Sequence, residues 1–148
     1  MKVSIHDTTR CPDYSATKIR RLARWLAENI PEFHASEWAE ISIVVTDDAG
    51  ISEINERFLK HRGPTDCITF TLPPMPGETK RHGEIYVNSE RAIFEARRRR
   101  IESSHELAFY IAHGFDHLCG FDDRTPRQRA AMHRRERTWL RAAIRQAL

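Results

Sequence analysis

The chain has 148 residues, of which 40% are apolar and 30% charged, with six glycines and seven prolines. This composition excludes collagen-like, low-complexity and largely disordered proteins, and the length suits one hydrophobic core. We therefore expect a single domain over residues 1–148. The formal net charge is +3, and 13 of the 20 arginines follow residue 90. An arginine-rich half suits phosphate recognition, although solvated helix faces give the same pattern.

The sequence indicates neither export nor membrane insertion. Charged residues and a histidine interrupt the first seven residues, and no window approaches the ~20 apolar residues of a membrane helix. The three cysteines, Cys11, Cys67 and Cys119, are too widely spaced for a CxxC metal knuckle, and their odd number argues against a disulfide framework. We expect a cytoplasmic protein without membrane contact.

Four strands are predicted in the first part of the chain. A short apolar start over residues 3–5 fits an edge strand, and the β-branched run over residues 41–45 predicts a second strand. Residues 67–72 alternate and stop at Pro73, which cannot continue a ladder. Residues 84–88 follow a proline- and glycine-containing loop and predict the fourth strand.

Helical periodicity begins early and dominates the second half of the chain. Apolar residues recur at helical spacing over residues 19–30, and this helix ends near Pro31. Asp47 or Asp48 can cap a second helix, and a third helix follows Asn88.

The fourth and fifth helices are marked at their ends. Ser103 with Glu106 three residues later has the form of a capping box, and Gly120 is placed to end the fourth helix. Thr125 and Gln128 repeat the capping pattern, with a proline between them in the first turn of the last helix. Because strands and helices interleave early and helices dominate late, the pattern predicts an α+β or α/β layered fold with a small sheet of about four strands. Of the two we take α+β, with one mainly four-stranded mixed sheet, about five helices and the fourth helix in the centre.

The most informative stretch runs from His113 to Asp123. On the predicted helix, His113 and His117 lie one turn apart on the same face, so two imidazoles can converge on one metal ion. Gly120 permits a turn that brings Asp122 or Asp123 back to the same point. Two histidines, a carboxylate and an open position for water form the arrangement of a catalytic zinc site. We take Asp123 as the third ligand and expect one zinc ion per chain.

A simpler interpretation is a pair of partly exposed histidines that hydrogen-bond to neighbouring groups. The glycine and the acidic residues that follow favour the metal site instead. For Glu106, helix capping is favoured over a supporting contact to the metal site. Four other histidines lack comparable spacing and are predicted to lie on the surface: His61, His82, His105 and His133.

The motif resembles the signature of the YbeY family, His-Gly-x-Leu-His-Leu-x-Gly-Tyr-Asp-His. The matching residues are His113, Gly114, His117, Leu118, Gly120 and Asp122, with Phe121 in place of the tyrosine. The likeness covers about residues 40–140 and includes four further blocks: residues 55–70 with Pro64-Thr65-Asp66, Gly83-Glu84-Ile85, Glu106-Leu107-Ala108, and Met132 with Glu136.

This resemblance implies a zinc-dependent, single-strand-specific endoribonuclease that acts in rRNA maturation and ribosome biogenesis, with a metal-bound water as the nucleophile. The implied partners are single-stranded RNA, chiefly ribosomal RNA, and the small ribosomal subunit. The implied metal ligands are His113, His117 and Asp123.

Three positions depart from the family pattern. Asp123 stands where the family has its third zinc-binding histidine; a carboxylate can ligate, but it lowers the net charge of the site and weakens the metal as a Lewis acid. Leu59 stands where the family uses an arginine on RNA, which leaves Arg57 or Arg62 as substitutes. Asp116 replaces a leucine and is a candidate catalytic base, a partner of a metal ligand or a solvated surface charge, the last being slightly favoured.

Two other functions stay open. The chain can be a catalytically weak or inactive member of the same fold that binds RNA or the ribosome without cleaving it. The ligand spacing also fits a zinc peptidase of the metzincin type. The catalytic glutamate of that mechanism would stand where this chain has Gly114, and glycine cannot act as a base.

Overall fold

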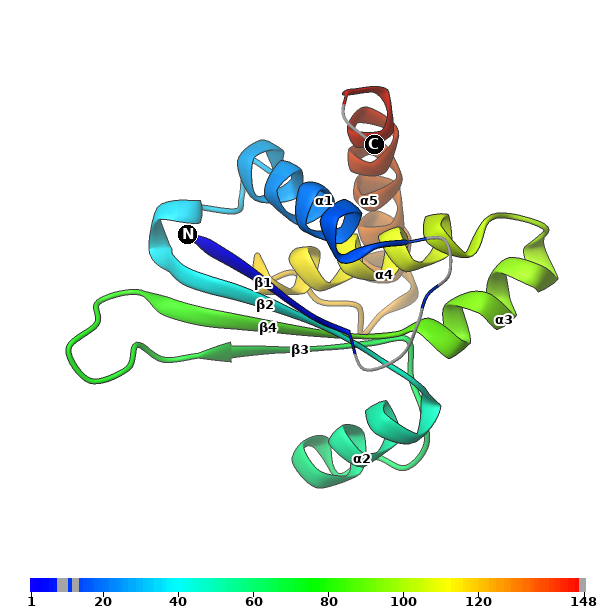
Figure 1. Cartoon of the computed structure of the whole chain (residues 1–148), viewed down its shortest axis with the longest axis horizontal. Coiled ribbons are helices and arrows are strands. Elements are labelled where there is room, and N and C mark those ends of the chain that lie inside the picture. The colour runs from blue at the N-terminus through cyan, green and yellow to red at the C-terminus, as the bar shows by residue number, and fades with distance from the viewer. Residues whose placement is uncertain (8–10, 12–13, 147–148) are drawn as a thin grey trace.

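In the computed structural model, which describes residues 1–7, 11 and 14–146, four strands form one mixed sheet (Figure 1). The strand order is β1 (Lys2–Asp7), β2 (Trp38–Thr46), β4 (Arg81–Asn88) and β3 (Cys67–Leu72). β2 pairs in parallel with both β1 and β4, and β3 pairs antiparallel with β4. The four predicted strands are confirmed, and β2 and β4 begin three residues earlier than predicted.

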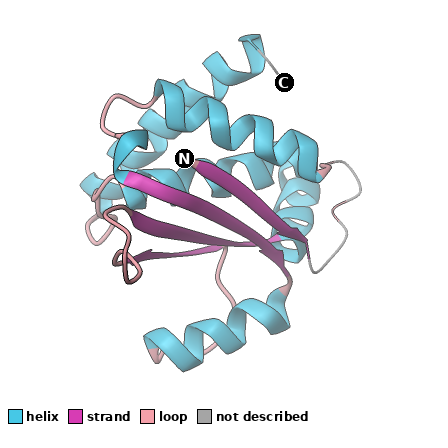
Figure 2. Ribbon diagram, turned by 60° about the vertical axis from the view of Figure 1, so that its left-hand side comes forward, coloured by secondary structure: helices cyan, strands magenta, loops and turns pink. Residues whose placement is uncertain are grey.

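The described part of the chain also forms five α-helices, which lie on both sides of the sheet. The helices are α1 (Ala16–Asn29), α2 (Asp48–Leu59), α3 (Ser89–Arg99), α4 (Ser103–Leu118) and α5 (Pro126–Gln146). Figures 1 and 2 show α1, α4 and α5 on one side of the sheet and α2 on the other. α4 contacts α1, α3, α5, β3 and β4 and so occupies the centre. The α+β fold class and the central place of the fourth helix are confirmed.

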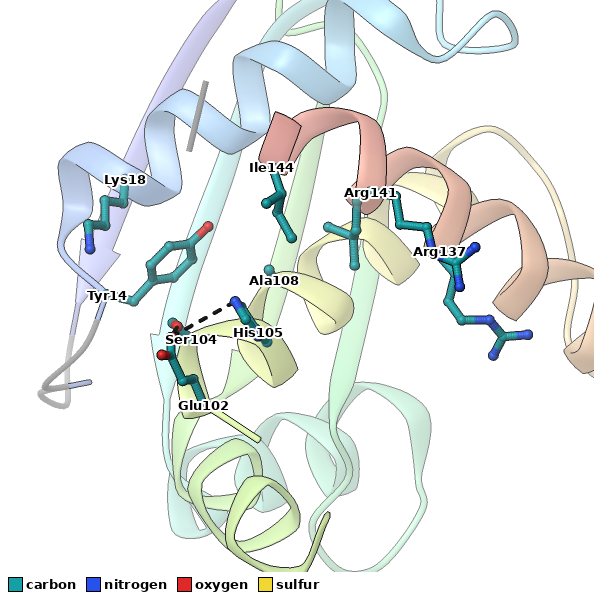
Figure 3. Close-up of a pocket in the computed structure, with 10 residues that line it drawn as sticks. Tyr14, Lys18, Glu102, Ser104, His105, Ala108, Arg137, Arg141 and Ile144 are labelled. Atoms are coloured by element: carbon teal, nitrogen blue, oxygen red, sulfur yellow. Dashed lines mark hydrogen bonds and ion pairs between the residues drawn. The ribbon is translucent and has the colours of Figure 1, made fainter. Parts of the chain in front are cut away.

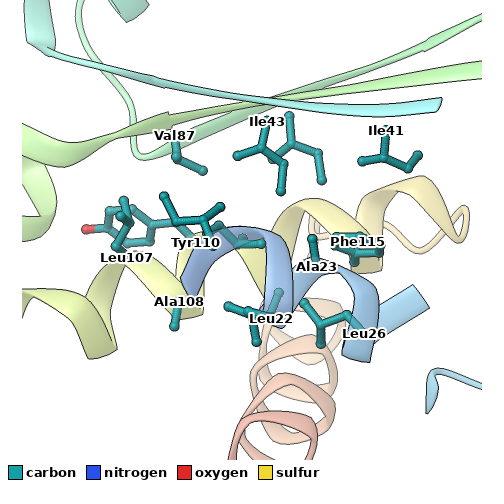
Figure 4. Close-up of a cluster of buried hydrophobic side chains, with 14 of the residues drawn as sticks. Leu22, Ala23, Leu26, Ile41, Ile43, Val87, Leu107, Ala108, Tyr110 and Phe115 are labelled. Atoms are coloured by element: carbon teal, nitrogen blue, oxygen red, sulfur yellow. The ribbon is translucent and has the colours of Figure 1, made fainter. Parts of the chain in front are cut away.

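The main core lies between the sheet and the helices α1 and α4 (Figure 4). Alternate residues of the strands point toward these helices, as the period of two in a strand requires. The residues of α1 and α4 that pack against these strand residues recur at helical spacing. The core residues of this layer are all fully or almost fully buried: Ile41, Ile43 and Val87 from the strands, Leu22, Ala23 and Leu26 from α1, and Leu107, Ile111 and Phe115 from α4.

Gly114 lets α4 approach the sheet closely. A Cβ atom at this position would lie 2.5 Å from the Cγ2 atom of Ile85 on β4, inside van der Waals contact. Gly83 on β4 is similar, because its Cβ would lie 2.7 Å from Ile41 Cδ1. The glycine between the two motif histidines therefore fixes the height of α4 above the sheet, which in turn fixes where those histidines lie.

Two of the predicted helix caps are confirmed. Asp47 accepts a hydrogen bond from the backbone N–H of Gly50 at 2.8 Å at the start of α2. Before α5, the Thr125 N–H donates to Gln128 Oε1 at 2.9 Å and the Gln128 N–H donates to Thr125 Oγ1 at 3.1 Å, which is a complete capping box.

The capping box predicted for Ser103 and Glu106 is wrong. Glu102 is the N-cap residue of α4, and its side chain makes no capping hydrogen bond. Glu106 is 4% exposed and its Oε2 atom lies 3.6 Å from Nη1 of Arg99 on α3. The short connection between α3 and α4 brings this arginine over the first turn of α4, so the carboxylate pairs with a cation rather than with the helix backbone.

Across the part of the chain that the structure describes, no helix has both the length and the apolar character needed to cross a lipid bilayer.

Candidate metal centre

His113 and His117 stand one turn apart on α4 and converge at their tips. Their ring centroids are 4.5 Å apart with an interplanar angle of 82°, and their Nε2 atoms are 3.1 Å apart. The side chains are 12% and 26% exposed, respectively. Both rings are therefore shielded from bulk water, with a small opening on the side of His117.

The chain turns back after α4 through Gly120, whose φ is +92°. The Gly120 N–H donates to the His117 carbonyl at 2.9 Å, and the Phe121 N–H donates to the Asp116 carbonyl at 3.4 Å, the pattern of a Schellman turn. A residue with a side chain is strained at this φ, so glycine is suited to the position. The predicted helix stop at Gly120 is confirmed.

This turn places Asp123, and not Asp122, beside the histidines. Asp123 Oδ2 lies 3.4 Å from His113 Nε2 and 3.5 Å from His117 Nε2. Asp122 turns away and pairs with Arg124 at 2.9 Å. The structure therefore brings together the three residues that the sequence predicts as ligands: His113, His117 and Asp123.

The spacing of these three donor atoms fits one tetrahedral zinc ion. With Zn–N and Zn–O bonds of about 2.0–2.1 Å, two ligand atoms of a tetrahedral ion lie about 3.3 Å apart. The three donor-to-donor distances are 3.1, 3.4 and 3.5 Å. The donor atoms of the three residues present therefore have a spacing that suits one zinc ion.

Glu136 on α5 supports the first histidine. Its side chain is fully buried, and its Oε1 atom lies 2.7 Å from His113 Nδ1, the ring nitrogen that points away from the other donors. From the sequence, Glu136 is predicted only as part of the family likeness, without a role in the site. The sequence does contain a sign that Glu136 is buried, because it falls on the apolar stripe of α5 between Met132 and Leu140. A carboxylate at such a position needs a buried partner.

The two histidines have pKa values shifted in opposite directions. Burial lowers the pKa of His113, but the hydrogen bond and charge of Glu136, aided by Asp66 and Asp123, outweigh burial and raise it above the usual value. Burial and the neighbouring His113 lower the pKa of His117. Of the two rings, His117 therefore loses its proton more readily, and His113 is the one polarised by a carboxylate.

The preference for Asp116 as a solvated surface charge is wrong. Its side chain is completely buried, and its Oδ1 atom accepts hydrogen bonds from Arg135 Nη2 at 2.9 Å and Nε at 3.3 Å. α5 covers this side of α4, which a helical projection of α4 alone does not show. Burial raises the pKa of Asp116 to about 6, Arg135 opposes the rise, and the charge of Glu136 adds to it. Asp116 lies outside the group of three donors and faces Arg135 instead.

His133 was also predicted to be a surface residue, and this too is wrong. Its half-buried ring lies 5.4 Å from the Phe109 ring and 6.2 Å from the His113 ring, because the first half of α5 packs over α4. His133 forms a second group of possible ligands with His113 and Glu136. His61 and His105 are exposed as predicted, whereas His82 is half-buried beside Glu78.

A cavity of about 500 Å³ opens beside the donor atoms. His117 and Asp123 form one wall, and Leu59, His61 and Arg62 line the cavity from the end of α2 and the loop that follows. Of the two candidate substrate-binding arginines, Arg62 lines this cavity, whereas Arg57 lies over the ring of Phe58 at 5.9 Å and is outside the lining.

Cys67 also lines this cavity, on the side of β3. Burial, with the charges of Asp66, Glu136 and Asp123, raises the pKa of the Cys67 thiol well above its usual value. The thiol is therefore neutral near pH 7, which argues against a role as a nucleophile.

Known proteins resemble this chain over nearly its whole length. The family described as endoribonuclease YbeY matches residues 4–143. A protein of that name from Roseiflexus castenholzii is 31% identical over 144 residues, covering 92% of this chain and 91% of that protein. One from Christiangramia forsetii is 32% identical over 126 residues, covering 84% of each.

The fold agrees as well. The solution structure of TM1509 from Thermotoga maritima superimposes with a TM-score of 0.62 at 20% identity, covering 95% of this chain and 88% of that one. With the match of the family over nearly the whole chain, and with the motif histidines gathered at one point of the fold, the chain belongs to the YbeY family.

Proposed function

We propose that this protein is a zinc-dependent endoribonuclease that cuts single-stranded RNA. The observation that carries the proposal is the triangle of donor atoms from His113, His117 and Asp123, whose sides of 3.1–3.5 Å suit one tetrahedral zinc ion. The relatives named endoribonuclease YbeY supply the reaction class and the substrate.

The chain's own residues would hold and orient the ion. His113 and His117 would ligate through Nε2, and Asp123 through Oδ2. Glu136 would accept the Nδ1 proton of His113, which fixes the ring and the tautomer needed for ligation. When bound, a divalent zinc ion activates water and polarises a phosphoryl oxygen.

Arg62 is our candidate for phosphate binding. It is exposed, it lines the cavity beside His117 and Asp123, and its guanidinium can hold two phosphate oxygens. Arg57 is the weaker candidate, because it lies outside that lining. We further propose ribosomal RNA in the small ribosomal subunit as the natural substrate, on the strength of the family resemblance alone.

The position of Asp116 speaks against a role as general base. It is completely buried and engaged by Arg135, whereas a base has to reach the water or the substrate. The peptidase alternative is weakened by Gly114, which packs on Ile85 and offers no carboxylate beside His113.

A non-cleaving RNA-binding protein is the second candidate. Two observations favour it: the third donor is a carboxylate, and Leu59 lines the cavity at the position of the family arginine. This candidate predicts RNA binding without cleavage.

The test is incubation of zinc-loaded protein with a 20-nucleotide single strand, the matching duplex, and casein. We expect internal cleavage of the single strand only, which stops in EDTA and in the His117→Ala variant. Intact RNA that is still bound would establish the non-cleaving candidate, and cleavage of casein would establish the peptidase.

A further inference from the structure

A second cavity, of about 400 Å³, lies at the other end of α4, where the starts of α1 and α4 meet the last turns of α5 (Figure 3). Figure 3 shows Tyr14 and Lys18 on the α1 side and Arg141 and Ile144 on the α5 side, with Ala108 of α4 between them. Tyr14, Ala108 and Leu140 are buried and give the cavity an apolar floor, which the proposed reaction does not use.

The rim of this cavity is positively charged. Lys18, Arg137 and Arg141 line it, and none of the three forms an ion pair with any residue that the structure describes. The acidic residue of the lining, Glu102, lies 3.9 Å from the imidazole of His105. An apolar floor beneath three cations without anionic partners suits a ligand that has a flat apolar body and a negative charge. A nucleotide has both, because its base can pack on the floor while its phosphate meets the arginines.

Between this cavity and the candidate metal centre, α5 packs along α4, and we call the line of contact between the two helices the seam. On α5, four residues at four-residue spacing follow one side of the helix: Arg129, His133, Arg137 and Arg141. At one end of the row, Arg129 donates a hydrogen bond to the carbonyl of Asp123 at 3.1 Å. At the other end, Arg137 and Arg141 reach the cavity.

Ring side chains line the α4 side of the same seam, again at four-residue spacing: His105, Phe109, His113 and His117. The His133 ring bridges two of them, at 5.4 Å from Phe109 and 6.2 Å from His113. Alternating cations and ring systems are the elements with which proteins bind single-stranded nucleic acid, through phosphate contacts and base stacking.

We propose that this seam is a track for single-stranded RNA and that the second cavity binds one nucleotide of the same strand that reaches the metal centre. From His105 to His117 the helix rises about 18 Å at 1.5 Å per residue, so the bound nucleotide lies several positions from the cleaved bond. The proposal rests on the proposed function, and it adds a reason for the chain to prefer longer strands.

The test compares the affinities of oligoadenylates of three and twelve nucleotides, measured by fluorescence anisotropy in EDTA so that no metal-dependent cleavage occurs. We expect wild type to bind the longer strand at least tenfold more tightly. The double variant Arg137→Ala/Arg141→Ala should lose at least tenfold in affinity for the twelve-nucleotide strand. Its slope of log affinity against log salt should fall by about 1.4, at ~0.7 per phosphate contact.

A matched control removes two arginines from the same helix outside the cavity lining. Arg127 and Arg134 are exposed, and Arg127→Ala/Arg134→Ala should change the affinity for the longer strand less than threefold. Ile144→Glu adds a negative charge at a 48% exposed position of the cavity and should weaken binding at least fivefold with both arginines in place.

Equal losses in the two double variants would show diffuse charge and overturn the proposal. Unchanged RNA affinity in Arg137→Ala/Arg141→Ala, with loss of binding to an acidic aromatic peptide, would make the cavity a protein-binding site and also overturn it. Either result leaves the proposed function standing. If wild type binds neither strand, the proposed function itself fails.

Discussion

Glu136 on α5 and Asp116 on α4 are both completely buried carboxylates that interact with each other, but their other partners differ. Glu136 lies 2.7 Å from Nδ1 of His113, and the other nitrogen of that ring faces two further donor atoms. Asp116 lies 2.9 Å from Arg135, whose guanidinium stacks on the Phe121 ring at 3.9 Å. One carboxylate supports a ligand, and the other joins α4 to α5. Burial of an acid near a histidine motif therefore does not identify its role. The role follows from what its partner contacts: His113 contacts two further donor atoms, whereas Arg135 contacts the Phe121 ring.

The largest expected effect, on zinc affinity, separates the two groups of possible ligands. The first group is His113, His117 and Asp123, and the second is His113, His133 and Glu136. His113 belongs to both groups, His117 only to the first, and His133 only to the second. If the group of His113, His117 and Asp123 holds the ion, His117→Ala should weaken zinc binding at least 100-fold, because only two of the three protein ligands remain. His133→Ala should change zinc affinity less than threefold. Competitive titration against a chromophoric chelator measures both, and the reverse ranking would move the site to His133 and Glu136.

The second-largest expected effect is the difference in zinc affinity between variants of the two carboxylates, Glu136 and Asp116. Glu136→Gln should reduce zinc affinity about 10–100-fold, the usual result of removing a supporting partner of a ligating histidine. Asp116→Asn should reduce it less than threefold. Both variants keep the size of the side chain, so a loss of equal size in the two would mean that the carboxylates act as one unit.

Asp116 should matter for stability instead. Asp116→Leu restores the residue typical of the family but leaves the Arg135 guanidinium, which is 28% exposed, without its anion. We expect the free energy of unfolding to fall by about 2 kcal/mol, less than for a fully buried pair because solvent reaches Arg135. Urea denaturation measures the change. Adding Arg135→Met should recover most of the loss, and a further loss in the double variant would contradict the pairing.

The smallest expected effect concerns the turn that carries Asp123. Gly120→Ala forces a side chain onto a residue with φ of +92° and should lower the free energy of unfolding by about 1 kcal/mol. Because the turn sets the position of Asp123 but not that of Glu136, zinc affinity should fall while the contact between His113 and Glu136 persists. Histidine NMR resonances report that contact, and their collapse in this variant would show that the turn and α5 are coupled.

Local patterns predicted the strands, the helices and the three converging donors, because each depends on neighbours in sequence. The turn at Gly120 is an example: His113, His117 and Asp123 lie within one short segment, and glycine allows the reversal. The predictions that proved wrong all concern residues that contact another helix. Glu106 meets Arg99 across the α3–α4 junction, and Asp116 and His133 are covered where α5 crosses α4.

A helical projection of α4 shows its faces but not which helix covers them. The missing information for Asp116 and Glu136 was the register of α5 on α4, which places Arg135 opposite one and His113 opposite the other. A charge on the apolar stripe of α5 was the one local sign of that register.

The proposed function depends most on a single ion held by His113, His117 and Asp123 together. Anomalous diffraction at the zinc edge from crystals of zinc-loaded protein tests this directly. We predict one strong peak within about 2.2 Å of His113 Nε2, His117 Nε2 and an oxygen of Asp123. A peak at His113 Nδ1 with His133 and Glu136, or no ordered zinc at saturating metal, would contradict the account.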